Sequence, residues 1–472
     1  MSEVLRSTNP ARPDDLVGEF PVADAAAVAA AVARARTAFP AWRDLGLERR
    51  AGCLHRFRDL VAQRQEDLAR LISREAGKAI WEARAEAALV PAKVDVTLGA
   101  GMALLAPMDV GGGARASFFP RGTLAVLGPF NFPAHLPSGH VVPALACGNT
   151  VVLKPSDQTP AVGAWLAERW REAGLPEGVL ELVQGGAETG RVLSAYRGVD
   201  GVLFTGSWPV GRAIQEANLD QPGKILALEM GGKNAVVVLA DADLELAVAE
   251  TALSIAATTG QRCTCASRVF VETPVLEEFA ERLATTLAGL RVGDPLDEGT
   301  FMGPLISQAA WERVEKQRTG ARDAGGERID FRVDLPPPFT GPALVRFESV
   351  RQAHPYQRDE LFAPEAALYG VPDLEGAIAA VNDSDYGLAA SVFTRDRERY
   401  ERCVGRIRTG ILNWNRGTIG ASGKLPFGGI GRSGNDRPAG VTASLYCTVP
   451  QAHLEQAGGL DPAALPPGFP RP

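Results

Sequence analysis

A cysteine nucleophile is the first chemistry that the sequence suggests. Cys263 lies in GQRCTCA (260–266), which joins a predicted helix to a predicted strand, so its side chain could face a cleft. A free thiol is only a few per cent ionised at neutral pH, so a nucleophilic cysteine needs a positive charge or a base nearby. Arg262 and a nearby lysine could supply that charge. The alternative is a small, buried cysteine without a catalytic role, which is a common use of this residue.

Two polar residues at the ends of predicted strands could complete such a site. Glu229, in LEMGGKN (228–234), ends an apolar run and precedes two glycines. Burying a carboxylate is costly unless it has a partner or a task. Asn131, in GPFNFP (128–133), is flanked by aromatic residues and prolines and could donate to a developing oxyanion. Seen alone, each also fits a polar residue at a turn.

Two further segments could hold a phosphate-bearing ligand. Lys154 follows a predicted strand in VLKPSDQTP (152–160) and is one of 7 lysines against 42 arginines, which suggests a position where a guanidinium does not fit. In FTGSWPVG (204–211), a Gly-Ser turn leads into a helix whose free N–H groups suit a pyrophosphate. The alternatives are a solvated lysine and an ordinary turn, because the glycine fingerprint of ordinary dinucleotide folds is absent.

Alternating strands and helices position these segments. Short apolar runs alternate with helical patterns between residues 123 and 239, which is typical of a parallel sheet covered by helices. Ligands bind such sheets at the carboxyl ends of the strands, so we expect the site there. The predicted strands are 123–127, 150–153, 180–183, 202–204, 225–228 and 235–239.

Helices are predicted before this sheet, over residues 23–105, and a second α/β unit after it. The second unit has predicted helices at 244–257, 275–290 and 308–324, strands at 268–272, 366–371 and 390–393, and a proline-rich loop at 334–342. The tail after Pro450 is rich in Pro, Gly and Ala, which predicts an extended or poorly ordered chain.

The composition disfavours several classes of protein. The 472 residues carry a net charge of −7 and are 46% hydrophobic, ordinary values for a globular chain of two or three domains, and the acidic balance disfavours nucleic-acid binding. Six cysteines and five histidines form no disulfide framework or metal pattern. Neither a membrane span nor a secretory signal is recognisable. We therefore expect a cytoplasmic, metal-free protein that binds neither nucleic acid nor membrane.

Together, the motifs identify a family. The chain resembles the aldehyde dehydrogenase superfamily over nearly its whole length. Asn131 and Lys154 are 23 residues apart and Glu229 and Cys263 are 34 apart, spacings that fit this family. The resemblance rests on GPFNFP, LKPS, FTGS, LEMGGK, GQRC, ELFAP (360–364), Asn413 and PFGG (426–429).

Within the superfamily, the chain is most similar to the N-succinylglutamate 5-semialdehyde dehydrogenases of arginine catabolism. The closer likeness lies in NFPAHLPSGHVVPALACGNT (131–150), PGKILALEMGG (222–232), GQRCTCA, NWN (413–415) and SGNDRPAG (433–440). The sequence departs from the usual residues at Asp157, Lys233, Ala235 and Ala363, where Glu, Asn, Pro and Gly are usual.

The resemblance implies an α/β, aldehyde dehydrogenase-like fold with three parts. These are a Rossmann-type NAD-binding domain (1–105 and 124–235), an α/β catalytic domain (236–440), and a small β oligomerisation arm with a tail (106–123 and 441–472). It also implies a homodimer or homotetramer.

The resemblance further implies a mechanism. The Cys263 thiolate attacks the aldehyde carbon, the oxyanion is held by the Asn131 amide and the Cys263 backbone N–H, and hydride passes to the nicotinamide. Glu229 then activates water to hydrolyse the thioester, and its retention argues against transfer to coenzyme A. Lys154 would bind the cofactor ribose and add positive potential near the thiol.

The implied cofactor is NAD. An acidic Asp157 at the adenosine ribose favours free hydroxyls over a 2′-phosphate, so NADP is the less favoured cofactor. The cofactor-binding residues implied by the family are Lys154, Ser156, Asp157, Gly206, Ser207, Gly211, Glu360 and Phe362.

Two residues beside the nucleophile have alternative roles. Arg262 is expected to contact a carboxylate of the substrate or, alternatively, to anchor the backbone or lie at the surface. Cys265 could form a regulatory disulfide with Cys263, but the ring would be strained, so an ordinary buried thiol is favoured.

Two other functions stay open at this point. The first is oxidation of another acidic semialdehyde, such as succinic or glutamic semialdehyde. The second is a non-catalytic homologue that acts as a binding protein, although intact Asn131, Lys154, Glu229 and Cys263 argue against it.

Overall fold

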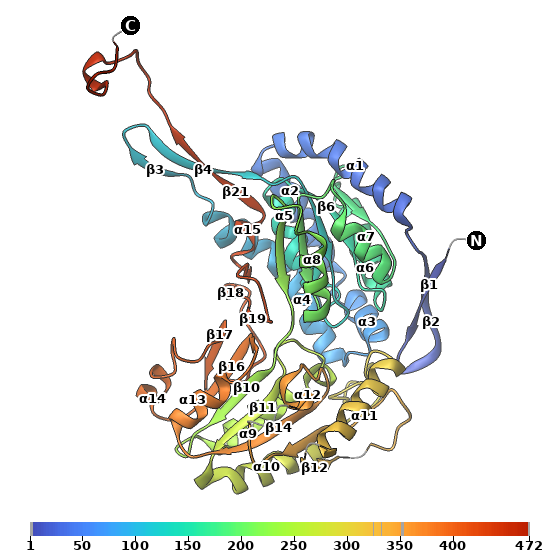
Figure 1. The fold of residues 1–472 in the computed structure, drawn as a ribbon. Coiled ribbons are helices and arrows are strands. Elements are labelled where there is room, and N and C mark those ends of the chain that lie inside the picture. The colour runs from blue at the N-terminus through green and yellow to red at the C-terminus, as the bar shows by residue number, and fades with distance from the viewer. Residues whose placement is uncertain (1–2, 324, 332, 351–353, 471–472) are drawn as a thin grey trace.

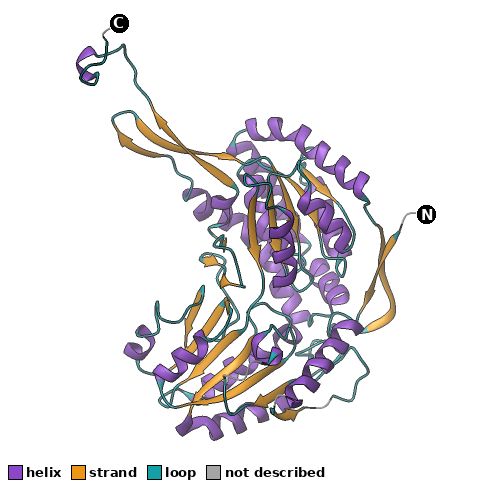
Figure 2. Cartoon of the chain, viewed as in Figure 1, coloured by secondary structure: helices purple, strands orange, loops and turns teal. Residues whose placement is uncertain are grey.

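Two α/β bodies, each built around a sheet, form most of the molecule, and a β arm projects from one of them (Figure 1). The computed structural model describes residues 3–470 except 324, 332 and 351–353. Residue 324, the expected end of one helix, and the last two residues of the expected tail therefore lie outside the described residues. Strands occupy the centre of each body and helices cover them (Figure 2).

The first body contains a parallel sheet of five strands in the order β7-β6-β5-β8-β9. Every residue of β5, β6 and β8 is buried, as expected for a parallel sheet covered on both faces. The strands are β5 (Thr123–Leu127), β6 (Thr150–Lys154), β7 (Leu180–Leu182), β8 (Gly201–Thr205) and β9 (Ile225–Glu229).

Helices cover both faces of this sheet because alternate strand residues point to opposite sides. Leu124 and Val126 pack on one face, under α2 to α6, whereas Ala125 and Leu127 pack on the other, under α1, α7 and α8. The helices are α1 (Ala25–Asp44), α2 (Leu47–Gln63), α3 (Gln65–Ala76), α4 (Ile80–Val96), α5 (His135–Ala146), α6 (Pro160–Glu172), α7 (Ala187–Ala195) and α8 (Trp208–Ala217).

The second body contains a sheet of seven strands in the order β12-β13-β14-β11-β10-β16-β17, parallel except for the edge strand β12. The strands are β10 (Asn234–Val238), β11 (Ala266–Glu272), β12 (Glu327–Asp330), β13 (Ala343–Arg346), β14 (Glu365–Val371), β16 (Ala389–Phe393) and β17 (Ile411–Trp414). The helices are α9 (Leu244–Ala256), α10 (Leu276–Ala288), α11 (Gln308–Asp323), α12 (Pro355–Arg358), α13 (Leu374–Asn382) and α14 (Arg397–Glu401).

One predicted strand lies in a different sheet from the one expected. The run 235–239 was grouped with the first sheet, but β10 pairs with β11 and β16 in the second. The chain crosses between the bodies in the four residues Met230–Lys233. The hydrophobic pattern could not reveal this crossing, because β10 is as apolar and as fully buried as its predecessors.

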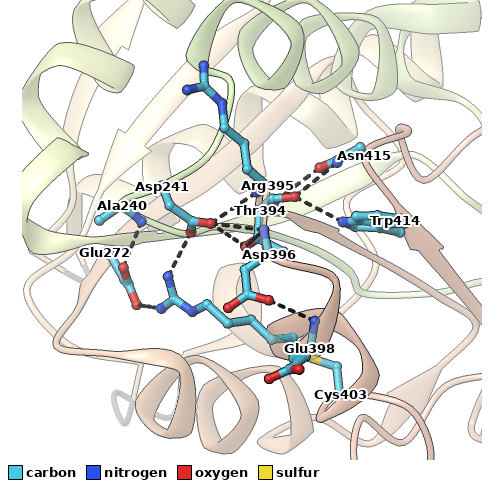
Figure 3. Close-up of polar contacts among 11 residues, drawn as sticks. Ala240, Asp241, Glu272, Thr394, Arg395, Asp396, Glu398, Cys403, Trp414 and Asn415 are labelled. Carbon is cyan, nitrogen blue, oxygen red and sulfur yellow. Dashed lines mark hydrogen bonds and ion pairs between the residues drawn. The ribbon is translucent and has the colours of Figure 1, made fainter.

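Charged residues tie together the carboxyl ends of β10, β11 and β16. The Asp241 carboxylate accepts from the Thr394 hydroxyl over 2.7 Å (Figure 3). It also accepts from the Arg399 guanidinium over 2.7 Å, and this guanidinium pairs with Glu272 as well. This network fixes the edge of the second sheet that lies opposite the predicted catalytic segments, because those segments precede the strands.

Smaller β elements complete the fold. The N-terminal hairpin of β1 (Val4–Asn9) and β2 (Arg12–Pro21) was not predicted. The arm has the order β21-β4-β3, formed by β3 (Met108–Gly111), β4 (Ala114–Pro120) and β21 (Thr448–Leu454), so strand structure continues beyond Pro450 into the expected tail. Near the catalytic segments are β15 (Tyr386–Gly387), β18 (Pro426–Phe427), β19 (Ile430–Gly431), β20 (Ala439–Gly440) and α15 (Ala443–Tyr446).

Candidate active site

Opposite edges of the two sheets meet at the site. Asn131, Lys154 and Glu229 lie at or after the carboxyl ends of strands in the first sheet. Cys263 and Glu360, in contrast, precede β11 and β14 of the second sheet and lie at its amino edge. The predicted site residues of the first sheet therefore lie at its carboxyl edge, whereas those of the second lie at its amino edge, because the chain enters the second sheet from the site.

A hydrogen bond joins the two edges. The Asn131 Nδ2 donates to the carbonyl oxygen of Gln261 over 2.8 Å, and Asn131 is only 5% exposed. An amide NH₂ carries two donors. One donor thus fixes the side chain against the loop of Cys263, and the second remains for an oxyanion.

Asn234, which the sequence analysis did not single out, binds the backbone of the Cys263 loop. Its Nδ2 donates to the carbonyl oxygens of Cys263 (2.7 Å) and Cys265 (2.8 Å), while its Oδ1 accepts from the N–H of Ala389 (3.0 Å). The only signal in the sequence was an asparagine at the start of an apolar, buried strand. The Thr418 hydroxyl also holds this loop, because it donates to the Thr264 carbonyl over 2.6 Å.

A strained turn leads into this loop. Thr258 and Thr259 have φ angles of 53° and 55°, in the left-handed region that β-branched residues rarely adopt. Gly260 has φ 70°, and a Cβ there would lie 2.0 Å from the backbone carbon of Ala363. Only glycine fits this approach, which brings the segment of Glu360 and Phe362 against the loop of Cys263.

Cys263 is half-buried, while the other five cysteines are buried, and all six are free. Burial raises the pKa of the Cys263 thiol, and the nearby carboxyls of Glu360 and Glu229 raise it further. Arg262 acts in the opposite direction. The resting thiol therefore holds its proton at neutral pH and needs an acceptor for it.

Glu229 ends β9 beside the crossing between the bodies. It is 6% exposed, and its Oε2 has no hydrogen-bond partner among the described residues. Burial raises the pKa of this carboxyl well above its usual value. A Cβ on Gly428 would lie 2.8 Å from Oε1, so glycine at this position leaves room for the carboxyl.

Lys154 and Asp157 lie together after β6. The Lys154 Nζ donates to the Pro155 carbonyl over 2.9 Å; burial lowers the pKa of this amine, and Asp157 partly counteracts that effect. The Ser156 hydroxyl donates to Asp157 over 3.4 Å, and a Cβ on Gly186 would lie 3.7 Å from the same carboxylate. The loop after β6 thus holds an amine and a carboxylate close together.

The turn after β8 leads into α8. Ser207 is the N-cap of this helix, and its side chain makes no capping hydrogen bond. The first N–H groups of a helix have no partner within it, so they can serve an anion. Gly211 packs against Met230, because a Cβ there would lie 2.2 Å from the sulfur. Gly206 is fixed by its N–H, which donates to the Glu229 carbonyl.

Glu360 and Phe362 reach the site from the segment before β14. The Glu360 Oε1 accepts from the Gly232 N–H over 3.1 Å, and burial raises the pKa of Glu360 to about 8. Phe362, with φ 53°, contacts Phe130 edge to face with 5.8 Å between the ring centroids. Both residues therefore connect the second body to the loops of the first.

Arg262 is held within the protein. Its Nε donates to the Thr258 hydroxyl (2.8 Å), and its guanidinium pairs with Glu82, whose side chain is 1% exposed. Both partners are side chains, so Arg262 is neither at the surface nor bonded to the backbone through these contacts, and its contact with a substrate carboxylate stays a prediction. Cys265 is buried, and burial raises the pKa of its thiol to about 12.

The chain is similar to known proteins over nearly its whole length. The aldehyde dehydrogenase family model matches residues 1–452. The N-succinylglutamate 5-semialdehyde dehydrogenase of Burkholderia thailandensis is 41% identical over 99% of this chain and 96% of its own length.

The chain belongs to the aldehyde dehydrogenase family. It is accordingly an NAD(P)-dependent aldehyde dehydrogenase, and the predicted fold and enzyme class are confirmed. PnpE in complex with nicotinamide adenine dinucleotide matches it with a TM-score of 0.92 at 30% identity, covering 98% of this chain and 96% of PnpE. GapN of Methanocaldococcus jannaschii, a glyceraldehyde-3-phosphate dehydrogenase complexed with NADP, matches with a TM-score of 0.88 at 26% identity, covering 96% and 98%.

Among the described residues of this aldehyde dehydrogenase, no helix has the length and hydropathy needed to cross a membrane. Within the same residues, no three side chains of His, Cys, Asp or Glu are grouped to hold a metal ion.

Differences in burial predict the order in which the cysteines react. Cys263 is the only cysteine with substantial exposure among six described thiols, so iodoacetamide should label it about tenfold faster than Cys265 at pH 8. Peptide mapping during the reaction measures both rates. Labelling of Cys265 or of another cysteine before Cys263 would contradict the geometry described above.

Proposed function

We propose that this enzyme oxidises N-succinylglutamate 5-semialdehyde to N-succinylglutamate with NAD, as a step of arginine catabolism. The observation that carries the proposal is the convergence of Asn131, Glu229 and Cys263 from the two facing sheet edges. The substrate is suggested by relatives of that name, such as the 41% identical protein of Burkholderia thailandensis.

In the first half of the reaction, the Cys263 thiol gives its proton to solvent water, and its sulfur forms a bond to the aldehyde carbon. The carbonyl oxygen becomes an oxyanion, which accepts from the free N–H of the Asn131 amide and from the Cys263 backbone N–H. The cofactor, when bound, supplies the hydride acceptor that converts this adduct into a thioester. Lys154, Ser156, Asp157, Gly206, Ser207, Gly211, Glu360 and Phe362 would hold it, and the first turn of α8, which the Ser207 side chain does not cap, fits a pyrophosphate.

In the second half, Glu229 takes a proton from water, whose oxygen attacks the thioester carbon. The carbon–sulfur bond breaks, the carboxylic acid leaves and Cys263 recovers its thiol. Because burial raises the pKa of Glu229, this step should accelerate as pH rises and the carboxyl loses its proton.

Glu229→Gln should separate the two halves. The variant should keep a burst of NADH, because acylation does not need this base, and its steady-state kcat should fall by about 100-fold or more. Stopped-flow absorbance measures both quantities. Loss of the burst together with turnover would contradict the assignment of Glu229 to deacylation.

We also propose that NAD is preferred over NADP. Asp157 places a carboxylate beside Lys154 after β6, where a 2′-phosphate would meet a like charge. Related structures include one complex with NAD and one with NADP. The proposed preference therefore rests on Asp157 of this chain.

Asp157→Ser should therefore raise the ratio of kcat/KM for NADP to that for NAD by about tenfold, since repulsion of the phosphate is removed. The matched control is Gln158→Ala, because Gln158 is exposed beside it. Steady-state kinetics with both cofactors measures the ratio, and an unchanged ratio would show that Asp157 does not select the cofactor.

The rival semialdehydes can be separated by a specificity profile. We expect kcat/KM for N-succinylglutamate 5-semialdehyde to exceed that for succinic and glutamic semialdehyde by about tenfold or more, a difference worth about 1.4 kcal/mol. A higher value for either rival reassigns the substrate. Absence of NAD-linked activity on all three aldehydes favours a non-catalytic binding protein instead.

Assembly, domain organisation and location complete the proposal. The proposed domains are 1–105 with 124–235 and 236–440, the boundary at 235/236 falls within β10, and the arm and tail are 106–123 and 441–472. The arm carries exposed apolar side chains at Met108, Val110 and Leu454, which support pairing with a second copy as a homodimer or homotetramer. Six free cysteines suit a reducing cytoplasm.

A further inference from the structure

Helix α4 presents a buried charged face to the two loops of the active site. Glu82 and Glu86 lie four residues apart on this helix, and Lys78 lies just before it. Residues at this spacing share one side of a helix. All three are buried, with exposures of 2%, 1% and 2%, although buried charges are costly unless they are paired.

Lys78 and Glu86 bind the loop that carries Asn131. The Lys78 Nζ donates to Glu86 over 2.5 Å and lies 3.7 Å from the centre of the Phe132 ring. The other oxygen of Glu86 accepts from the backbone N–H groups of Ala134 (2.9 Å) and His135 (3.0 Å). Glu86 thereby fixes the start of α5, four residues after Asn131.

Glu82 binds the loop that carries Cys263. It accepts from the Thr258 N–H (2.9 Å) and hydroxyl (2.8 Å), and it pairs with the Arg262 guanidinium. Arg262 also lies over the Phe132 ring, 5.1 Å from its centre. The Phe132 ring thus contacts the cations of both branches, Lys78 and Arg262.

We propose that Glu82 is a positioning residue for the nucleophile. Glu82 binds the strained Thr258 turn and neutralises Arg262 beside the Cys263 thiol. Glu86 does the same for the Asn131 loop through backbone N–H groups. The inference rests on the proposed role of Cys263. It adds that helix α4 sets the position of the oxyanion donor, Asn131, relative to the nucleophile.

The proposal has an electrostatic consequence that a packing role lacks. Arg262 favours the thiolate of Cys263, and Glu82 offsets its charge. Glu82→Gln keeps the size and part of the hydrogen bonding but leaves Arg262 unpaired. The pKa of Cys263 should therefore fall, although the loop is held less firmly.

The test combines alkylation and kinetics in the full-length enzyme. For Glu82→Gln we expect the pH profile of Cys263 alkylation by iodoacetamide to move about one unit lower. We also expect kcat/KM for the aldehyde to fall about tenfold, while KM for NAD stays within twofold. Glu82→Asp keeps the charge but is shorter, so it should lower kcat/KM without moving the profile.

Two further variants serve as controls. Arg84→Gln changes a charge on the same helix that pairs with Glu66 and Glu298 at the surface, so it should alter neither quantity. Glu82→Gln combined with Arg262→Gln should restore the profile, because the unpaired charge is gone.

An unmoved alkylation profile in a folded Glu82→Gln variant overturns the proposal. If that variant does not fold, normal kcat/KM in Glu82→Asp overturns it instead. Failure of the proposed function would give another result. The Cys263→Ser variant would then retain activity, whichever residue stands at position 82.

Discussion

The hydrogen bond from the Asn131 amide to the Gln261 carbonyl is the contact on which the site depends. It joins the carboxyl edge of one sheet to the amino edge of the other across 130 residues of sequence. In the proposed mechanism, each sheet alone offers half of the chemistry, an oxyanion donor and base from the first and a thiol from the second. The four-residue crossing between β9 and β10 keeps these edges face to face and leaves Glu229 beside both.

Low polarity around these groups shapes their reactivity. Burial raises the pKa values of Glu229, Glu360 and Cys263, and it lowers that of Lys154. The resting site therefore avoids placing several like charges together. Proton transfers, rather than fixed charges, must then accompany formation and hydrolysis of the thioester. The same burial explains why the Arg262 charge is balanced by Glu82, since an unpaired cation so close to the thiol would be costly.

The sequence predicted most of the fold and the four central site residues because each of these signals is local. Asn131, Lys154 and Glu229 follow apolar runs, and Cys263 lies in a distinctive loop, so strand ends and family motifs were enough to find them. Features that depend on distant partners could not be predicted. β10 has the pattern of either sheet, and the Glu82–Arg262 pair spans 180 residues. Asn234 likewise gave no sign that its amide binds two carbonyls of the nucleophile loop.

The most direct test of the account is to locate the covalent intermediate. The enzyme is mixed with NAD and N-succinylglutamate 5-semialdehyde, quenched with acid within milliseconds, digested and mapped by mass spectrometry. The account predicts a thioester of the N-succinylglutamyl group on the peptide that contains Cys263, released by mild base. An acyl group on Cys265 or on another residue, or turnover without any acyl-enzyme, would contradict it.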